Sequence, residues 1–222
     1  AGEIIAAFAV AMMERHGLET RVLNVGGGLG VRYVEGDEPM PVEEYSRLIV
    51  NAVASALDGS GLDPVLAQEP GRALVAESGV SLYKVGVVKT VPSPGHGLRT
   101  YVSVDGGMSD NPRPALYGSR YTVERVWPDP GPVPTIRVTV SGKHCEADRL
   151  FDGVQLPEDV APGDLLQVLC TGAYGASMAS NYNRYPRPAM VMIDQSGQPR
   201  VVQRRETWDQ MFGREELLGG GG

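Results

Sequence analysis

The chain has 222 residues, of which 42% are hydrophobic and 21% are charged, ordinary values for a globular protein of one or two domains. Its formal net charge of −7 argues against nucleic acid as a partner. No apolar run approaches the roughly 20 residues that a membrane span needs, so we expect no membrane partner. Two cysteines, Cys145 and Cys170, do not suggest a disulfide framework, and we interpret both as thiols of a cytoplasmic protein. The sequence suggests no metal site.

The first 79 residues alternate between helical and strand patterns. Apolar residues recur at helical spacing over residues 2–16 and 41–57, and short apolar strands are expected at 21–25 and 65–67. This alternation indicates parallel α/β structure. Because one strand–helix–strand piece cannot bury a parallel sheet, we expect a stub of a larger barrel, or completion by another chain.

Residues 80–212 have a different character. They contain runs rich in Val, Tyr, Thr and Leu, separated by turn residues, which predicts an antiparallel β domain of the Greek-key or barrel-like kind. The expected strands are 80–91, 99–105, 135–141, 164–170, 189–194 and 200–203. We expect residues 213–222 to be a disordered tail.

Two loops follow the parallel strands and contain candidate ligand-binding residues. In Gly26-Gly27-Gly28, backbone N–H groups can approach a phosphate with no Cβ in the way. The alternative, which the loop alone favours, is a turn that merely needs positive φ. In Glu69-Pro70-Gly71-Arg72, the carboxylate can hold a protonated ring nitrogen and the guanidinium an anion. Spacing alone favours an ordinary Glu69–Arg72 ion pair.

Arg113 and Tyr117 lie in a polar, turn-rich stretch of the second part. Arg113 can bind a substrate carboxylate through two parallel hydrogen bonds, and Tyr117 can add a third. The alternative is a surface loop with a solvated arginine. Further on, Tyr174 can donate to a phosphate, or simply pack as an aromatic residue at a bend.

Cys145 and Glu146 follow a predicted strand. A thiol there can give a proton to a carbanion, and the carboxylate can bind an ammonium group. The alternative for Cys145 is a small buried hydrophobic residue, which is also how we interpret Cys170. We interpret Lys143 and His144 as solvated neighbours of Cys145.

These motifs occur in a distinctive order. The series GGGLG, EPGR, DGGMSDNPRPALYG, GKHCEADRL, GAYGASMASNYN and RRET over residues 1–209 closely resembles the C-terminal half of the diaminopimelate decarboxylases. Those enzymes have the alanine-racemase-like fold, a (β/α)8 barrel that binds pyridoxal 5'-phosphate (PLP), followed by a β domain. The resemblance therefore implies the C-terminal part of such a barrel and the β domain after it.

The resemblance also implies a reaction and roles for residues. The reaction is the PLP-dependent decarboxylation of meso-2,6-diaminopimelate to L-lysine and CO2 in lysine biosynthesis. The residues that would contact the PLP are Gly26, Gly27, Gly28, Glu69, Pro70, Gly71, Arg72 and Tyr174, with Glu69 at the ring nitrogen. Those that would contact the amino-acid substrate are Arg72, Arg113, Tyr117, Glu146 and Tyr174. Cys145 would be the proton donor, acting with Glu146 across a homodimer interface.

The chain departs from the family in one respect. The family's Schiff-base lysine lies earlier in the barrel, and none of Lys84, Lys89 and Lys143 has its sequence context. We therefore expect a fragment that is inactive alone, or one half of a split enzyme. The alternatives are a related PLP decarboxylase of the ornithine, arginine or carboxynorspermidine type, and a non-catalytic remnant that binds a ligand or a partner.

Overall fold

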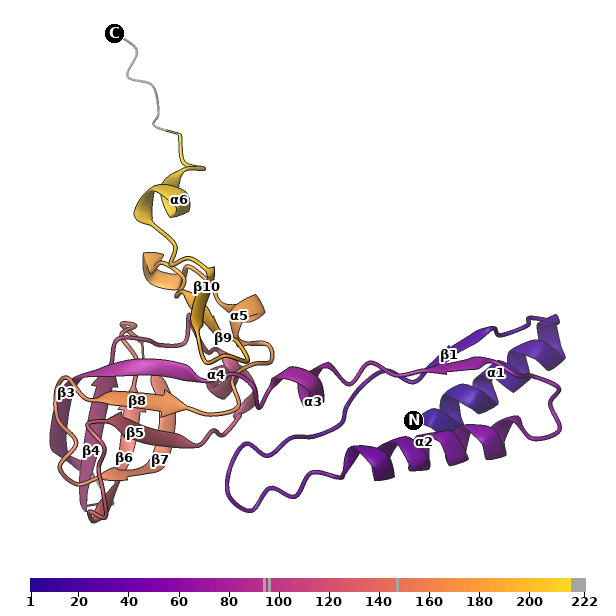
Figure 1. Ribbon diagram of the computed structural model, residues 1–222, viewed down its shortest axis with the longest axis horizontal. Helices are drawn as coiled ribbons and strands as arrows, with labels where there is room; N and C mark the ends of the chain where they lie inside the picture. Colours follow the sequence, from indigo (N-terminus) through magenta and orange to yellow (C-terminus); the bar gives the residue numbers. More distant parts are fainter. Residues whose placement is uncertain (94, 96, 147, 217–222) are drawn as a thin grey trace, which may run out of the picture. The chain divides into compact units, whose positions relative to one another are not determined.

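The computed structural model describes residues 1–93, 95, 97–146 and 148–216 (Figure 1). The chain divides into two compact units, the first comprising Ala1–Val80 and Cys170–Ala173. The second comprises Ser81–Leu169 and the chain from Tyr174 onward. Of the tail expected to be disordered, residues 213–214 form a turn after the last helix, residues 215–216 follow without regular structure, and residues 217–222 lie outside the described residues.

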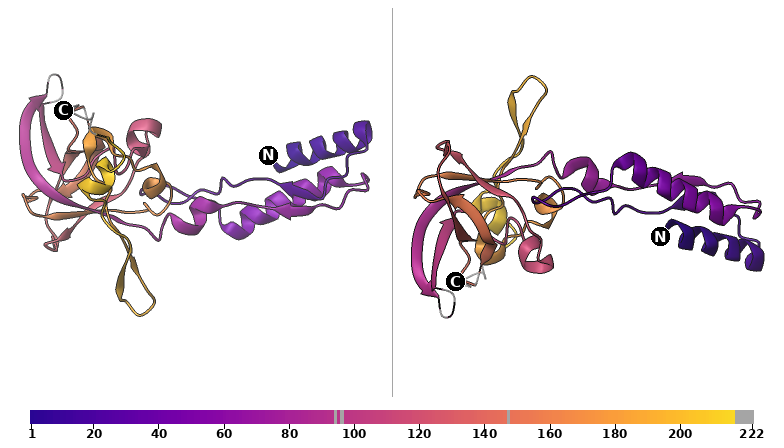
Figure 2. Two further views of the ribbon diagram at one scale, coloured as in Figure 1. Left: turned by 90° about the horizontal axis from the view of Figure 1, so that it is seen from above. Right: turned by 90° about the horizontal axis from the view of Figure 1, so that it is seen from below.

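The first unit has the predicted alternation of helices and strands. Its elements are α1 (Gly2–His16), β1 (Val22–Asn24), α2 (Val42–Leu57), β2 (Val65–Ala67) and α3 (Gly71–Val75). Strands β1 and β2 pair in parallel, with Leu23 opposite Leu66. The helix α1 ends at His16 and is capped by Gly17, whose left-handed φ of 65° glycine adopts without strain. Helices α1 and α2 lie side by side in all three views of Figures 1 and 2.

Small residues form the buried face of α1. Ala6 and Ala9 are buried, and a Cβ on Gly2 would lie 3.3 Å from Val53 Cγ2 of α2. By contrast, Ile4 and Phe8 are 74% and 63% exposed, although their spacing helped to predict the helix. Glycine and alanine allow α1 and α2 to approach closely. Ile4 and Phe8, on the opposite face of α1, are left largely uncovered by the other residues of this unit.

A second, smaller cluster in the first unit includes one of the two cysteines. Cys170 is buried with Val31, Ala76 and Ala173, which confirms its interpretation as a small buried hydrophobic residue. Burial raises the pKa of the Cys170 thiol, with Glu77 adding to the effect. Both cysteines are free thiols.

The second unit is built on a six-stranded sheet of order β5-β8-β3-β4-β6-β7. The strands are β3 (Ser81–Ser93), β4 (Gly97–Val104), β5 (Val123–Trp127), β6 (Thr135–Ser141), β7 (Arg149–Pro157) and β8 (Leu165–Val168). The edge strands β5 and β7 contact each other, so the sheet is nearly closed. Strands β4 and β6 are parallel, which corrects the prediction of a wholly antiparallel domain. The chain forms a short helix, α4 (Arg113–Tyr117), and β5 before it returns as β6 in the same direction as β4.

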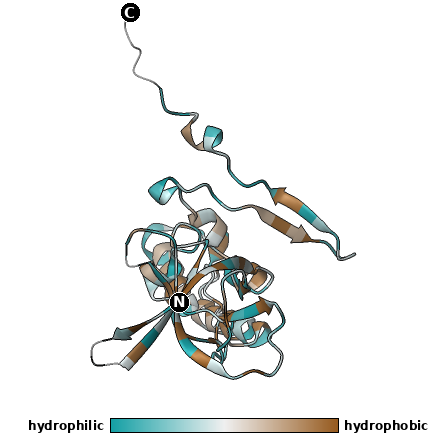
Figure 3. Ribbon diagram, turned by 90° about the vertical axis from the view of Figure 1, so that its left-hand side faces the viewer, coloured by the Kyte–Doolittle hydropathy of each residue, from teal (hydrophilic) through white to brown (hydrophobic). Residues whose placement is uncertain are grey.

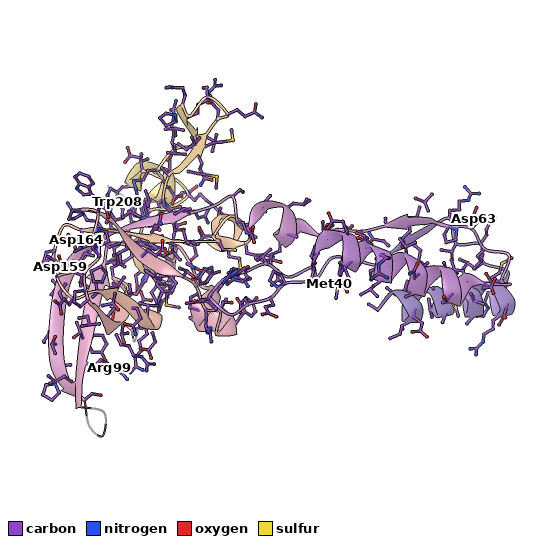
Figure 4. All side chains as sticks on the ribbon, turned by 60° about the horizontal axis from the view of Figure 1, so that its bottom comes forward. Met40, Asp63, Arg99, Asp159, Asp164 and Trp208 are labelled. Carbon is purple, nitrogen blue, oxygen red and sulfur yellow. The ribbon has the colours of Figure 1, made fainter. Side chains whose placement is uncertain are left out.

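Valine and leucine fill the interior of the sheet, where Val102, Val140, Leu156 and Leu166 are fully buried. One arginine is also buried there. The Nη1 of Arg125 lies 3.0 Å from Asp159 Oδ1 and 3.1 Å from Asp164 Oδ2. Asp159 and Asp164 are labelled next to each other in Figure 4. These two partners compensate the cost of burying the guanidinium group, whose side chain is only 3% exposed.

The rest of the second unit follows the sheet. It contains α5 (Gly175–Met178), the 3-10 helix η1 (Tyr182–Arg184), the hairpin β9 (Met190–Ile193) and β10 (Pro199–Gln203), and α6 (Trp208–Phe212). The hairpin contains apolar residues, whose positions are coloured toward brown on the ribbon in Figure 3, and their side chains are exposed. A two-stranded hairpin has little stability alone, so this element needs further contacts. In the described part of the chain, no helix combines the length and apolar character needed to cross a bilayer.

Candidate active site

The loops after β1 and β2 are joined by hydrogen bonds at the carboxyl ends of the two strands. The N–H of Val25 donates to Ala67 O at 3.0 Å, and that of Glu69 donates to Gly26 O at 2.8 Å. Asn24 ties the loops further, because its Nδ2 donates to Glu69 Oε1 at 2.7 Å and its Oδ1 accepts from Gly26 N at 2.8 Å. The glycine loop and the Glu69 loop therefore form one edge, where barrel enzymes bind ligands.

The three glycines of this edge are required for different reasons. Gly26 and Gly28 have φ of 73° and 109°, which side chains rarely adopt. Gly27 is needed for its size, because a Cβ on it would lie 2.2 Å from the carbonyl oxygen of Glu69. The Tyr45 hydroxyl donates to Gly27 O at 2.8 Å and fixes the loop from α2. The loop is thus a tight backbone cradle as well as a turn.

Glu69 and Arg72 lie on the loop after β2 and differ in burial. The carboxylate of Glu69 is exposed and accepts the amide hydrogen of Asn24. Arg72 is half-buried in the first turn of α3, and Gly71 N–H donates to Glu69 O at 2.8 Å. This turn keeps the acidic and basic side chains on one short loop.

The second unit brings two of the predicted residues, Tyr117 and Tyr174, to Arg113. The guanidinium carbon lies 4.5 Å from the ring centroid of Tyr174 and 5.5 Å from that of Tyr117. Arg113 Nε donates to Tyr121 Oη at 3.0 Å, and Nη2 donates to Ser119 Oγ at 3.3 Å. Arg113 is half-buried and held on several sides, so the alternative of a solvated loop arginine is wrong.

Two glycine-containing loops pack around Asp148 in the same unit. Gly142 N–H donates to Asp148 O at 2.8 Å, and Met108 N–H donates to Asp148 Oδ1 at 3.2 Å. A Cβ on Gly107 or Gly142 would lie 2.5 Å or 2.0 Å from Asp148 Oδ2. Burial raises the pKa of Asp110, which lies in the loop 105–111, and the nearby positive charge of Lys143 acts in the opposite direction. These glycines allow the loop 105–111 to lie directly on Gly142, His144 and Asp148.

His144 is a residue that sequence reasoning missed. It is 6% exposed rather than solvated, because the rings of Tyr182 and Tyr185 pack on it with centroids at 5.4 Å and 5.2 Å. Its Nε2 lies 3.0 Å from Ser109 Oγ, and its Nδ1 lies 2.8 Å from Asn183 Oδ1. In the sequence, only its position next to Cys145 in the motif could have indicated that His144 belongs to the site.

Lys143 is also more than a solvated neighbour. Its Nζ lies 4.4 Å from the ring centroid of Tyr185, whose hydroxyl donates to Lys143 O at 3.4 Å. Within the described ranges, no three His, Cys, Asp or Glu side chains gather as a metal site requires.

Cys145 and Glu146 are both exposed, so Cys145 is not the buried hydrophobic residue of the alternative interpretation. The Nδ2 of Asn183 donates to Cys145 Sγ at 3.9 Å. The backbone N–H of Asp148 donates to Glu146 O at 2.6 Å. The thiol and the carboxylate are exposed to solvent on adjacent residues.

Comparisons with known proteins identify the relatives of this chain. Residues 4–76 match the family described as pyridoxal-dependent decarboxylase, pyridoxal binding domain. The diaminopimelate decarboxylase of Bacillus subtilis strain 168 is 48% identical over 195 residues, which are 86% of this chain and 42% of that protein. The chain is a relative of the diaminopimelate decarboxylases. It spans less than half the length of this relative.

Solved structures of diaminopimelate decarboxylases have the same fold. The structure from M. jannaschi has a TM-score of 0.84 at 30% identity and covers 97% of this chain and 47% of its own. The Helicobacter pylori structure, complexed with L-lysine, has a TM-score of 0.79 at 32% identity. The match covers 96% of this chain and 48% of the Helicobacter pylori chain. The fold is therefore part of a PLP-binding barrel with the β domain of these enzymes, and the cofactor of the family is PLP.

Proposed function

We propose that the protein decarboxylates meso-2,6-diaminopimelate to L-lysine and CO2 with PLP, and that this chain supplies part of its active site. The chain spans 42% of the Bacillus subtilis relative, so the activity belongs to the whole protein. The observation that carries the proposal is the joined edge formed by Gly26–Gly28 and Glu69–Arg72 in a chain related to pyridoxal-dependent decarboxylases. The Arg113 cluster supports the choice of substrate.

The residues of the first unit fit a phosphorylated pyridine. The edge has no side chain at Gly27, where a Cβ would meet the backbone of Glu69. We propose that the three glycines, Pro70, Gly71 and Arg72 hold the phosphate, and that Glu69 lies at the ring nitrogen. PLP supplies an electron sink when it is bound. A carboxylate beside the ring nitrogen keeps that nitrogen protonated and strengthens the effect.

The Arg113 cluster fits the end of the substrate that does not react. Diaminopimelate has a carboxylate and an ammonium group there, whereas lysine and ornithine lack that carboxylate. A guanidinium held by Tyr121 and Ser119 is preorganised for a bidentate carboxylate contact. We propose that Arg113, Tyr117, Tyr174 and Arg72 contact the substrate, with Tyr174 also on the cofactor.

We assign the proton-transfer step to Cys145. The thiol donates its proton to the carbon that has lost CO2, and Glu146 binds the distal ammonium group of the substrate. We propose that both act across the interface of a homodimer, as the family resemblance implies. The exposure of both side chains leaves them available for such a role. Free thiols suit a cytoplasmic enzyme.

The proposal is tested by completing the enzyme. This chain is joined to, or mixed with, the lysine-bearing N-terminal portion of a diaminopimelate decarboxylase, and lysine and CO2 are measured with PLP present. We expect turnover of diaminopimelate in the completed protein. The chain alone should give no turnover and no borohydride-reducible PLP adduct on Lys84, Lys89 or Lys143. A completed protein that folds and binds PLP, yet releases no CO2, contradicts the proposal.

Replacing Arg113 by Ala in the completed enzyme tests the substrate. We expect kcat/KM for diaminopimelate to fall by about 10²–10³, because the distal carboxylate loses a bidentate charged contact. Activity on ornithine should change much less. The exposed Arg120, changed to Ala, controls for the loss of a positive charge nearby. Equal losses on both substrates favour the alternative, a related decarboxylase of another amino acid.

A further inference from the structure

A chain of hydrogen bonds links a buried backbone group to the exposed thiol of Cys145. Ser109 N–H lies 3.3 Å from His144 Nε2, and His144 Nδ1 lies 2.8 Å from Asn183 Oδ1. Asn183 Nδ2 lies 3.9 Å from Cys145 Sγ. The four residues come from three separate segments of the second unit, so the fold assembles this chain.

The backbone of Ser109 sets the direction of every bond in it. A backbone N–H can only donate, so we assign Nε2 of His144 as the acceptor and place the ring proton on Nδ1. The Ser109 hydroxyl, 3.0 Å from the same Nε2, then donates to it as well. The proton on Nδ1 is donated to the carbonyl oxygen of the Asn183 amide. The NH2 end of the amide then faces the sulfur, an assignment fixed by the network rather than by the shape of the side chain.

The loop that carries Asn183 is held in an uncommon conformation. Asn183 has φ 52° and ψ 25°, in the left-handed region that asparagine tolerates better than most residues. Asn181 Nδ2 donates to Tyr185 O at 3.1 Å and also to Glu206. Arg187 N–H donates to the same carboxylate at 3.0 Å. The backbone bond from Arg187 and the bond from Asn181 lower the pKa of Glu206. Glu206 therefore braces the loop.

We propose that Asn183 is a positioning residue for Cys145, an inference that rests on the proposed function. In the proton-transfer step the S–H bond breaks, and a C–H bond forms with the electron pair left by departing CO2. The sulfur is left as an anion, and the exposed thiolate regains a proton from solvent. An N–H aimed at the sulfur fixes its direction and stabilises this anion. The amide itself carries no proton onward, so the chain orients the thiol rather than relaying protons.

The isosteric change Asn183→Asp tests this arrangement. Aspartate tolerates the same backbone conformation and still offers an oxygen to His144 Nδ1–H, but it presents an oxygen to the sulfur in place of an N–H. In the full chain with Cys170→Ala, we expect iodoacetamide to alkylate Cys145 at least about threefold more slowly at fixed pH. Two-bond 1H–15N NMR spectra of His144 should still report the Nδ1–H tautomer. Asn51→Asp on α2 controls for the added charge.

The completed enzyme gives the second readout. Asn183→Asp should lower kcat for diaminopimelate by about tenfold and leave KM unchanged, because substrate binding does not involve the amide. Unchanged alkylation of Cys145 in the Asp variant overturns the positioning role. If alkylation is slower in the Asp variant but the completed wild-type enzyme does not decarboxylate diaminopimelate, the positioning role is supported and the proposed function is overturned instead. The alkylation assay needs no cofactor, so the two failures are distinguishable.

Discussion

Changing Gly27 to Ala is expected to weaken PLP binding by the completed enzyme at least about 100-fold, or about 2.7 kcal/mol. The added Cβ would lie 2.2 Å from the carbonyl oxygen of Glu69, 3.1 Å from its carbonyl carbon and 3.5 Å from Pro70 Cα. All three neighbours are backbone atoms, so no side chain can rotate away. The two loops would have to separate, which breaks the bond from Glu69 N–H to Gly26 O and disrupts the phosphate cradle.

The measurement is a titration of the completed protein with PLP, followed by absorbance. Gly30→Ala is the matched control in the same loop, because its Cβ would have only Pro39 Cβ near it, at 3.8 Å, and its φ is not in the left-handed region. We expect the control to bind PLP as the wild type does. Wild-type affinity in the Gly27 variant would contradict the assignment of this edge to the phosphate.

The sequence was most informative where one physical rule determined the structure. Helical periodicity located α1 and α2, and the glycine and Glu69 loops were predicted because the carboxyl ends of neighbouring parallel strands share an edge. The strands β5 and β7 were missed because polar residues interrupt their patterns. Arg125 is buried in β5 as an ion pair, and Asp152 of β7 accepts a hydrogen bond from Thr139.

Contacts between distant segments could not be predicted from local patterns. The parallel pairing of β4 with β6 depends on the path of the chain through α4 and β5. The burial of His144 depends on Tyr182 and Tyr185, which lie about 40 residues later and arrive only in the folded unit. Asn183 had no local signal at all, since its role follows from the partners that the fold brings to both ends of its amide.

Replacing Cys145 by Ala in the completed enzyme is expected to lower kcat by about 10²–10⁴, the usual contribution of a positioned acid. Cys145 is exposed and its sulfur contacts the Asn183 amide, so the change should leave the fold and PLP binding intact. The same substitution at Cys170 is the control. Cys170 is buried among Val31, Ala76 and Ala173 in the first unit, so Cys170→Ala should reduce stability rather than kcat.

Decarboxylation in D2O distinguishes loss of the Cys145 thiol as the proton donor from a general loss of activity in the variant. The wild-type enzyme should deliver deuterium to one face of the reacting carbon, because the thiol approaches from a fixed direction. Without the thiol, the proton must come directly from solvent. The deuterium should then be delivered to both faces of the reacting carbon. A Cys145→Ala enzyme with undiminished kcat and a single labelled face would assign the proton to another group. Glu146→Gln would then be the next variant to examine, since Glu146 carries the exposed carboxyl group adjacent to Cys145.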